Sequence, residues 1–145
     1  MKGKNPTSPA PEHEDIRQRL TGLRNVLLVL HKALVDSERV SYEQTVGTIQ
    51  SPNHFLQLLT SDPWFAWLQP FSQFIVAVDE ALEEKELLTA AGADALVKQT
   101  GRLLTASEAG EGFSRHYFDA LQRDPDVVLA HAEVLKLIHP RQRPG

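Results

Sequence analysis

The sequence predicts an all-α fold, a compact single-domain bundle of about five or six helices with short connections. Apolar residues recur at spacings of three and four over long stretches, which is the period of an amphipathic helix. Capping residues stand before several of these stretches. Strand signals are missing from the sequence, since it has no run of alternating β-branched residues and no Asn-Gly turn.

The first predicted helix is defined by apolar residues that alternate between spacings of four and three, which places them on one face. These residues are Ile16, Leu20, Leu23, Leu27, Leu30 and Leu34. Gly47 marks the expected end of this helix, because glycine tolerates the backbone that follows a helix terminus.

Later helix starts are predicted from cap residues followed by proline. The cap side chain accepts a hydrogen bond from an unpaired amide of the first turn, and proline has no amide to satisfy. The pattern occurs at Ser51-Pro52, Asp62-Pro63 and Asp124-Pro125. Thr89 predicts a further start, and Thr105 with Glu108 forms a capping box that predicts another. The last helix is expected to bury Val127, Val128, Val134, Leu135 and Ile138.

The predicted domain organisation is simple. We expect residues 1–12 to form a flexible arm, residues 13–138 to form the bundle, and residues 139–145 to form a short basic tail. The polar, proline-rich N-terminus has no apolar centre of the kind that signal peptides have. No stretch approaches the roughly 20 apolar residues of a membrane span, so we expect no membrane partner.

Composition narrows the function classes. The chain has no cysteine, which excludes disulfides, thiolate catalysis and cysteine-ligated metals and favours a cytoplasmic location. Its net charge of −4 argues against nucleic-acid binding, because that needs a basic surface. No lysine or arginine occurs between Arg39 and Lys85, although acidic residues do. Part of the surface should therefore be acidic and suit a basic or apolar partner.

The stretch SDPWFAWLQPF, residues 61–71, concentrates the aromatic residues of the chain. Pro70 cannot donate to a helical carbonyl, so we expect a break or kink there. One interpretation is that the aromatic side chains pack the core at this corner. The other is that they form a partner-binding surface, with Phe65 pointing away from the stripe of Trp64. The candidate residues are Trp64, Phe65, Trp67 and Phe71.

Three histidines fall on the apolar faces of three different predicted helices: His31, His116 and His131. If they converge, they can bind a metal with Glu38 or Asp119 as carboxylate ligand, or a haem with one axial histidine. The alternative is that each imidazole has its own hydrogen-bond partner and no cofactor is bound. The Glu-x-x-His pairs of di-iron bundles are absent from the sequence.

The sequence matches few of the residue patterns that known catalytic sites require. Ser114 and His116 lie two residues apart on a helix and face different directions, so they cannot act as nucleophile and base. The glycines around position 111 lack the Lys-Ser/Thr of a phosphate-binding loop. An enzyme that uses Glu38 with His31 is the third and weakest hypothesis.

Three stretches resemble, as a set, a family of small bacterial proteins with no assigned function. They are LLVLHKALVDSERVSYE, SDPWFAWLQPFSQFIVAVDEAL and RHYFDALQRDPDVVLAHAEV, and they span most of residues 26–136. The resemblance implies an all-helical cytoplasmic protein and brings no activity, cofactor or site residue with it.

The resulting hypothesis is a non-catalytic interaction or regulatory module. It would bind a partner protein or a second copy of itself through the aromatic corner, residues 61–74. The alternative is a metal- or haem-binding bundle that uses the three histidines.

Overall fold

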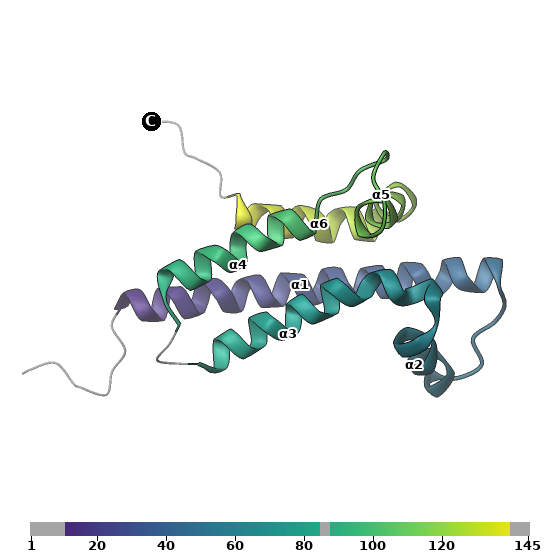
Figure 1. Cartoon of the computed structure of the whole chain (residues 1–145), viewed down its shortest axis with the longest axis horizontal. Helices are drawn as coiled ribbons and strands as arrows, with labels where there is room; N and C mark the ends of the chain where they lie inside the picture. Colours follow the sequence, from purple (N-terminus) through teal and green to yellow (C-terminus); the bar gives the residue numbers. More distant parts are fainter. Residues whose placement is uncertain (1–10, 85–87, 140–145) are drawn as a thin grey trace, which may run out of the picture.

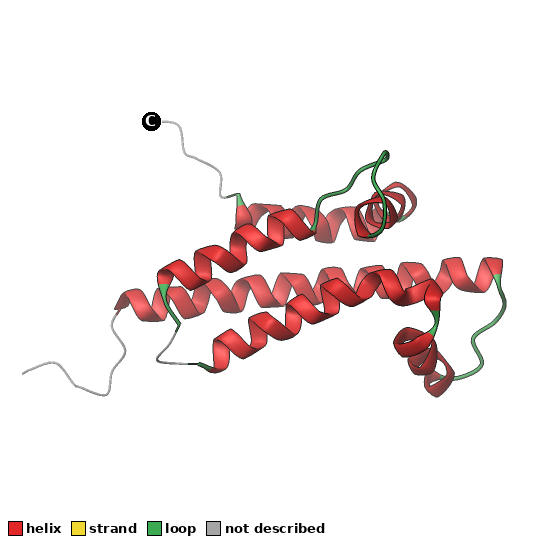
Figure 2. Ribbon diagram, viewed as in Figure 1, coloured by secondary structure: helices red, strands yellow, loops and turns green. Residues whose placement is uncertain are grey.

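The computed structural model describes residues 11–84 and 88–139 of the chain. The described residues form six α-helices and one short 3₁₀ helix and contain no strand, which confirms the predicted all-α bundle (Figures 1 and 2). The elements are α1 (Pro11–Thr45), α2 (Pro52–Ser61), η1 (Pro63–Leu68), α3 (Gln69–Glu83), α4 (Ala90–Leu103), α5 (Phe113–Arg123) and α6 (Pro125–Ile138). None of the helices in these two ranges is long and apolar enough to cross a membrane.

The helix α1 runs through the middle of the molecule, with α3 on one side and α4 and α6 on the other (Figure 1). Side-chain hydrogen bonds between α1 and α3 join Arg24 to Asp79 and His31 to Ser72. The two helices are therefore antiparallel. The helix α6 is also antiparallel to α1, because its C-terminal Leu137 lies beside Gly22 near the start of α1. Each neighbour therefore covers one flank of α1.

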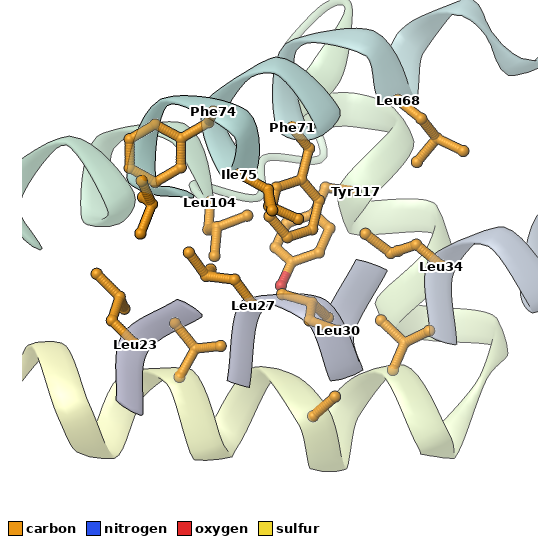
Figure 3. Packing of buried hydrophobic residues seen from close by; sticks show 14 of the residues in the cluster. Leu23, Leu27, Leu30, Leu34, Leu68, Phe71, Phe74, Ile75, Leu104 and Tyr117 are labelled. Carbon is orange, nitrogen blue, oxygen red and sulfur yellow. The ribbon is translucent and has the colours of Figure 1, made fainter. Parts of the chain in front are cut away.

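The predicted leucine stripe is the centre of the core. Its members from Leu20 to Leu34 are buried, and Figure 3 shows Leu27 and Leu30 meeting Phe71 and Tyr117 from α3 and α5. Each fully buried leucine contributes roughly 1.5–3 kcal/mol through removal of its surface from water. Burial of this stripe is therefore the main reason why the long first helix holds the bundle together.

Four predicted helix starts are confirmed by cap hydrogen bonds. The Ser51 hydroxyl accepts from the His54 amide at 3.0 Å, and the Thr89 hydroxyl accepts from the Gly92 amide at 3.0 Å. The carboxylates of Asp62 and Asp124 each accept from the amide two residues on, at 2.8 and 2.9 Å. The local chemistry of these residues thus sets the helix boundaries.

The capping box predicted at Thr105 is wrong. Thr105 lies in the loop after α4, where its hydroxyl donates to the Gly101 carbonyl at 3.1 Å and so extends the end of α4. The next helix begins only at Phe113, after Gly112 adopts a φ of 60°, a conformation that favours glycine. Thr105 is too far from the first turn of that helix to cap it.

The break expected at Pro70 lies slightly earlier in the chain. The 3₁₀ helix η1 ends at Leu68 and α3 begins at Gln69, so Pro70 occupies the first turn of α3. Proline is tolerated there because its missing amide would have had no partner. At the N-terminus α1 begins at Pro11, within the expected arm; residues 1–10 and 140–145 lie outside the described residues.

Two neighbouring leucines test the role of the stripe. We expect Leu27→Ala to lower the free energy of unfolding by about 2–5 kcal/mol, because it leaves a cavity in the core. Leu28→Ala, on the exposed side of the same turn, should cost less than about 1 kcal/mol. Urea unfolding followed by circular dichroism measures both, and equal losses would contradict the central position of the stripe.

Candidate functional site

The aromatic residues of the predicted corner lie mostly in the core. Phe65 is fully buried, with its ring centroid 5.5 Å from that of Tyr42 and 5.8 Å from that of Phe55. Phe71 and Trp67 are also buried, whereas Trp64 is partly exposed. Phe65 is therefore a core residue, whereas Trp64 keeps part of its surface exposed.

The local helix type explains the position of Phe65. Residues three apart eclipse one another in a 3₁₀ helix, which has 3.0 residues per turn. Phe65 and Leu68 therefore share the buried face of η1. Only Trp64 among the four candidates presents surface to a partner without rearrangement of the core, and partner binding by the corner stays a prediction.

The three candidate histidines have separate partners. His31 Nε2 lies 2.8 Å from the Ser72 hydroxyl, and His131 Nδ1 shares a hydrogen bond with the buried Tyr117 hydroxyl at 2.5 Å. Burial lowers the pKa of His31 and of His131 and raises the pKa of Tyr117. Both imidazoles are thereby held in the neutral form.

His116 differs from the other two because its side chain is exposed. It stacks on the Trp67 ring with centroids 5.2 Å apart and planes inclined by 17°. Over residues 11–84 and 88–139, no three histidine or acidic side chains are arranged to hold a metal ion. The metal hypothesis therefore gains no support from the placement of the histidines.

Glu38 and His31, the hypothetical catalytic pair, have different partners on different helices. The two residues lie two turns apart on α1, where His31 bonds to Ser72 of α3 and Glu38 pairs with Arg123 of α5. They cannot act on one substrate atom in this arrangement.

Four of the predicted site residues do meet at one place. A polar cavity of about 210 Å³ lies where α1, η1 and α5 come together. Its lining residues are Glu38, Ser41, Pro63, Trp64, His116, Asp119 and Arg123. The spacing of three residues between His116 and Asp119 places both on the cavity side of α5.

The polar cavity is built around an ion pair between the buried Glu38 and the more exposed Arg123. Glu38 is only 5% exposed and accepts from Arg123 Nη2, while Arg123 Nε donates to the Ser37 hydroxyl at 3.0 Å. A carboxylate in such a position needs a cationic or hydrogen-bonding partner, because an unpaired buried charge is costly. The position of Glu38 after the leucine stripe signalled that need, but nothing in the sequence identified Arg123 as the partner.

A second depression is the apolar groove between α1 and α6, with a volume of about 570 Å³. Val29 and Ala33 line it from α1, and Leu129 and Ala130 line it from α6. Charged residues surround them: Lys32, Asp36, Asp124, Asp126 and Glu133.

Sequence analysis missed the apolar groove. It placed Val128 and Leu135 on the buried face of the last helix, but both are exposed. Val127, Val134 and Ile138 are buried as predicted, and Ala130 completes the buried face. Leu129 remained outside every predicted stripe, and such an unassigned aliphatic residue is the signal that could have revealed the groove.

The exposed apolar surface continues from this groove across α1 to α3. Leu28 lies one turn from both Arg24 and His31, whose partners on α3 are Asp79 and Ser72. Val76 lies one turn from each of those partners, so it occupies the position opposite Leu28. We call the resulting row the apolar strip; its members Val76, Leu28, Val29 and Leu129 are 54%, 44%, 61% and 66% exposed.

Comparison with known proteins adds no relative, because no protein-family model, curated protein or solved structure matches this chain. The resemblance to a bacterial family stays a prediction.

The ion pair of the buried Glu38 with Arg123 yields a stability prediction. Arg123→Met leaves the Glu38 carboxylate without its cation, and we expect a loss of about 2–4 kcal/mol in the free energy of unfolding at pH 7. Lys32→Met breaks an exposed ion pair with Asp36 and should change the free energy of unfolding by less than about 0.5 kcal/mol. A double variant, Glu38→Met with Arg123→Met, should recover most of the loss in chemical unfolding experiments. A loss equal to that of Lys32→Met would contradict the structural role of the pair.

The neutral histidines yield a pH prediction. Because the folded-state pKa of His131 lies below its ordinary value of about 6.5, the unfolded chain binds more protons between the two values. Stability should therefore fall as the pH falls from about 7.5 to about 5.5. His131→Gln removes the titrating group but keeps an acceptor for Tyr117, so its loss over this range should be smaller. His139→Gln, which changes an exposed histidine, serves as the control. The urea midpoints of the unchanged protein and of both variants are measured at about pH 7.5 and about pH 5.5. An equal loss of stability in all three proteins would refute the role of His131.

Proposed function

We propose that this chain is a non-catalytic protein-interaction module that docks a partner helix on the apolar groove between α1 and α6. The observation that carries the proposal is the exposure of Val29 and Leu129, 61% and 66%, from the two helices that form the groove. Exposed aliphatic side chains that gather in one row mark interaction surfaces.

The shape of the groove suits a helix. Ala33 and Ala130 have the smallest side chains between the two helices, so they leave room between the larger Val29 and Leu129. The volume of about 570 Å³ falls within the roughly 300–1,000 Å³ of typical binding pockets. An amphipathic helix binds such a groove by inserting apolar side chains spaced three and four apart.

The charges around the groove specify the partner further. Four of the charged residues that line it are acidic and only Lys32 is basic. Lys32 pairs with Asp36 at 2.8 Å, whereas Asp126 forms no ion pair within the described part of the chain. A partner helix with lysine or arginine beside its aliphatic face is therefore complementary. The same acidity disfavours nucleic acid as a partner.

Self-association, which the sequence predicts, is a distinct outcome. Two copies that met through this groove would bring their acidic residues together, and like charges in an interface are unfavourable. Self-association through the partly exposed Trp64 avoids that conflict. A cytoplasmic location belongs to the same proposal, since the absence of cysteine favours it.

Peptide binding tests the proposal. A fluorescent peptide with leucines at helical spacing and lysines between them should bind the full chain, and a peptide with glutamates in place of the lysines should bind at least tenfold more weakly. Leu129→Asp should weaken binding of the basic peptide at least tenfold. Leu56→Asp, which replaces an equally exposed residue on α2, is the matched control and should leave the affinity within about twofold.

Fluorescence anisotropy measures these affinities, and sedimentation measures the oligomeric state. Equal binding of the two peptides, or equal effects of the two variants, would overturn the docking site. A dimer that Leu129→Asp dissociates would assign the groove to a second copy instead. A dimer that dissociates with Trp64→Ala but not with Leu129→Asp would show that the chain self-associates through the aromatic corner.

A further inference from the structure

We infer that the polar cavity at the junction of α1, η1 and α5 is a binding site for a small zwitterion, a molecule of free amino-acid type that carries one ammonium and one carboxylate group. The site is independent of the docking groove proposed above. It rests on the charges, the unused hydrogen-bonding atoms and the size of the cavity.

The charges at the cavity balance. Glu38 and Asp119 contribute two carboxylates, and Arg123 and Arg115 pair with them. A site with balanced charges has little net attraction for a free cation or a free anion. A ligand that is itself neutral overall, but carries both charges, can exchange partners with the cavity without leaving a buried charge unpaired.

The central ion pair leaves one acceptor and one donor unused. Glu38 accepts from Arg123 with Oε2, and no described residue donates to Oε1. Arg123 donates with Nε and Nη2, and its Nη1 has no acceptor among the described residues. Both side chains line the cavity. A ligand ammonium would donate to Glu38 Oε1, and a ligand carboxylate would accept from Arg123 Nη1.

The remaining walls limit the size and character of the ligand. A volume of about 210 Å³ corresponds to roughly seven water molecules, which matches a small amino acid. Pro63 and Trp64 supply an apolar wall, and an edge-on contact with Tyr42 at 5.7 Å holds the Trp64 ring. A small aliphatic side chain fits this wall. A metal ion fits less well, since no three ligating side chains in the described ranges are arranged around one point.

Stacking on Trp67 fixes the plane of the His116 ring at the edge of the cavity. Its ring nitrogens have no hydrogen-bond partner among the described residues, so one of them is available to the ligand carboxylate as a donor. Asp119, one turn further along α5, offers a second acceptor for the ammonium group.

The two tryptophans of the chain provide a built-in measurement. Trp64 lines the cavity and Trp67 stacks on His116, so their indole N–H signals in ¹H–¹⁵N spectra report on it. We expect L-valine to shift the Trp64 signal saturably, with a Kd in the millimolar range or below. Isobutylamine and isovalerate are L-valine without its carboxylate and without its ammonium, and each should bind at least tenfold more weakly. A Trp64→Phe variant assigns the signal.

Variants locate the contacts. Glu38→Gln and Arg123→Lys should each weaken L-valine binding at least tenfold. Asp119→Asn changes a half-exposed side chain with little expected cost in stability, so it tests the site even if the Glu38 and Arg123 variants unfold. Asp119→Asn should weaken the binding of L-valine and leave the binding of isovalerate unchanged. Asp36→Asn, an acidic residue outside the cavity, is the matched control and should have no effect.

Three results would overturn the inference. The first is the absence of a saturable shift with L-valine up to about 50 mM, well above a millimolar Kd. The second is binding of isobutylamine as tight as that of L-valine, which would make the cavity a site for simple cations. The third is insensitivity of L-valine binding to both Asp119→Asn and Glu38→Gln, which would place the ligand outside the cavity.

Discussion

The burial of one leucine stripe on α1 is the constraint on which the rest of the structure depends. The helix is 35 residues long, and α3, α4, α5, α6 and η1 all contact it. None of these neighbours exceeds 15 residues, so no single one can cover α1 from end to end. The flanks of α1 are therefore shared between shorter helices, and the outer face of α1 stays uncovered. The apolar strip is a direct consequence of that division.

The stripe changes character at its C-terminal end, where Ser37 and Glu38 replace leucine as the buried residues. Arg123 donates a hydrogen bond to each of them from the end of α5. Polar contacts are directional, whereas leucine packing is not. The ion pair thus fixes how α5 and α6 lie along α1, in a way that apolar burial alone would leave less specific.

The sequence predicted the elements whose cause is local and failed where the cause is distant or unusual. Helix spacing identified the leucine stripe, and cap chemistry identified four helix starts, since both depend on residues close together in the chain. The burial of Phe65 depends on Tyr42 and Phe55, so helix spacing alone left the core and surface interpretations of the aromatic corner open. Thr105 was misassigned because the next helix begins only at Phe113, after the turn at Gly112. The pairing of Glu38 with a residue 85 positions away could not be predicted without the fold.

The same reasoning explains why the candidate site residues separated into two groups. His31 and His131 each found a hydroxyl partner inside the bundle and became structural, whereas Glu38, Trp64, His116 and Asp119 gathered around the polar cavity. The turn between α5 and α6 connects this cavity to the apolar groove. Arg123 lines the cavity, and the next residue, Asp124, caps α6 and lines the groove. The ion pair of Glu38 and Arg123 therefore holds in place the one turn that contributes side chains to both surfaces.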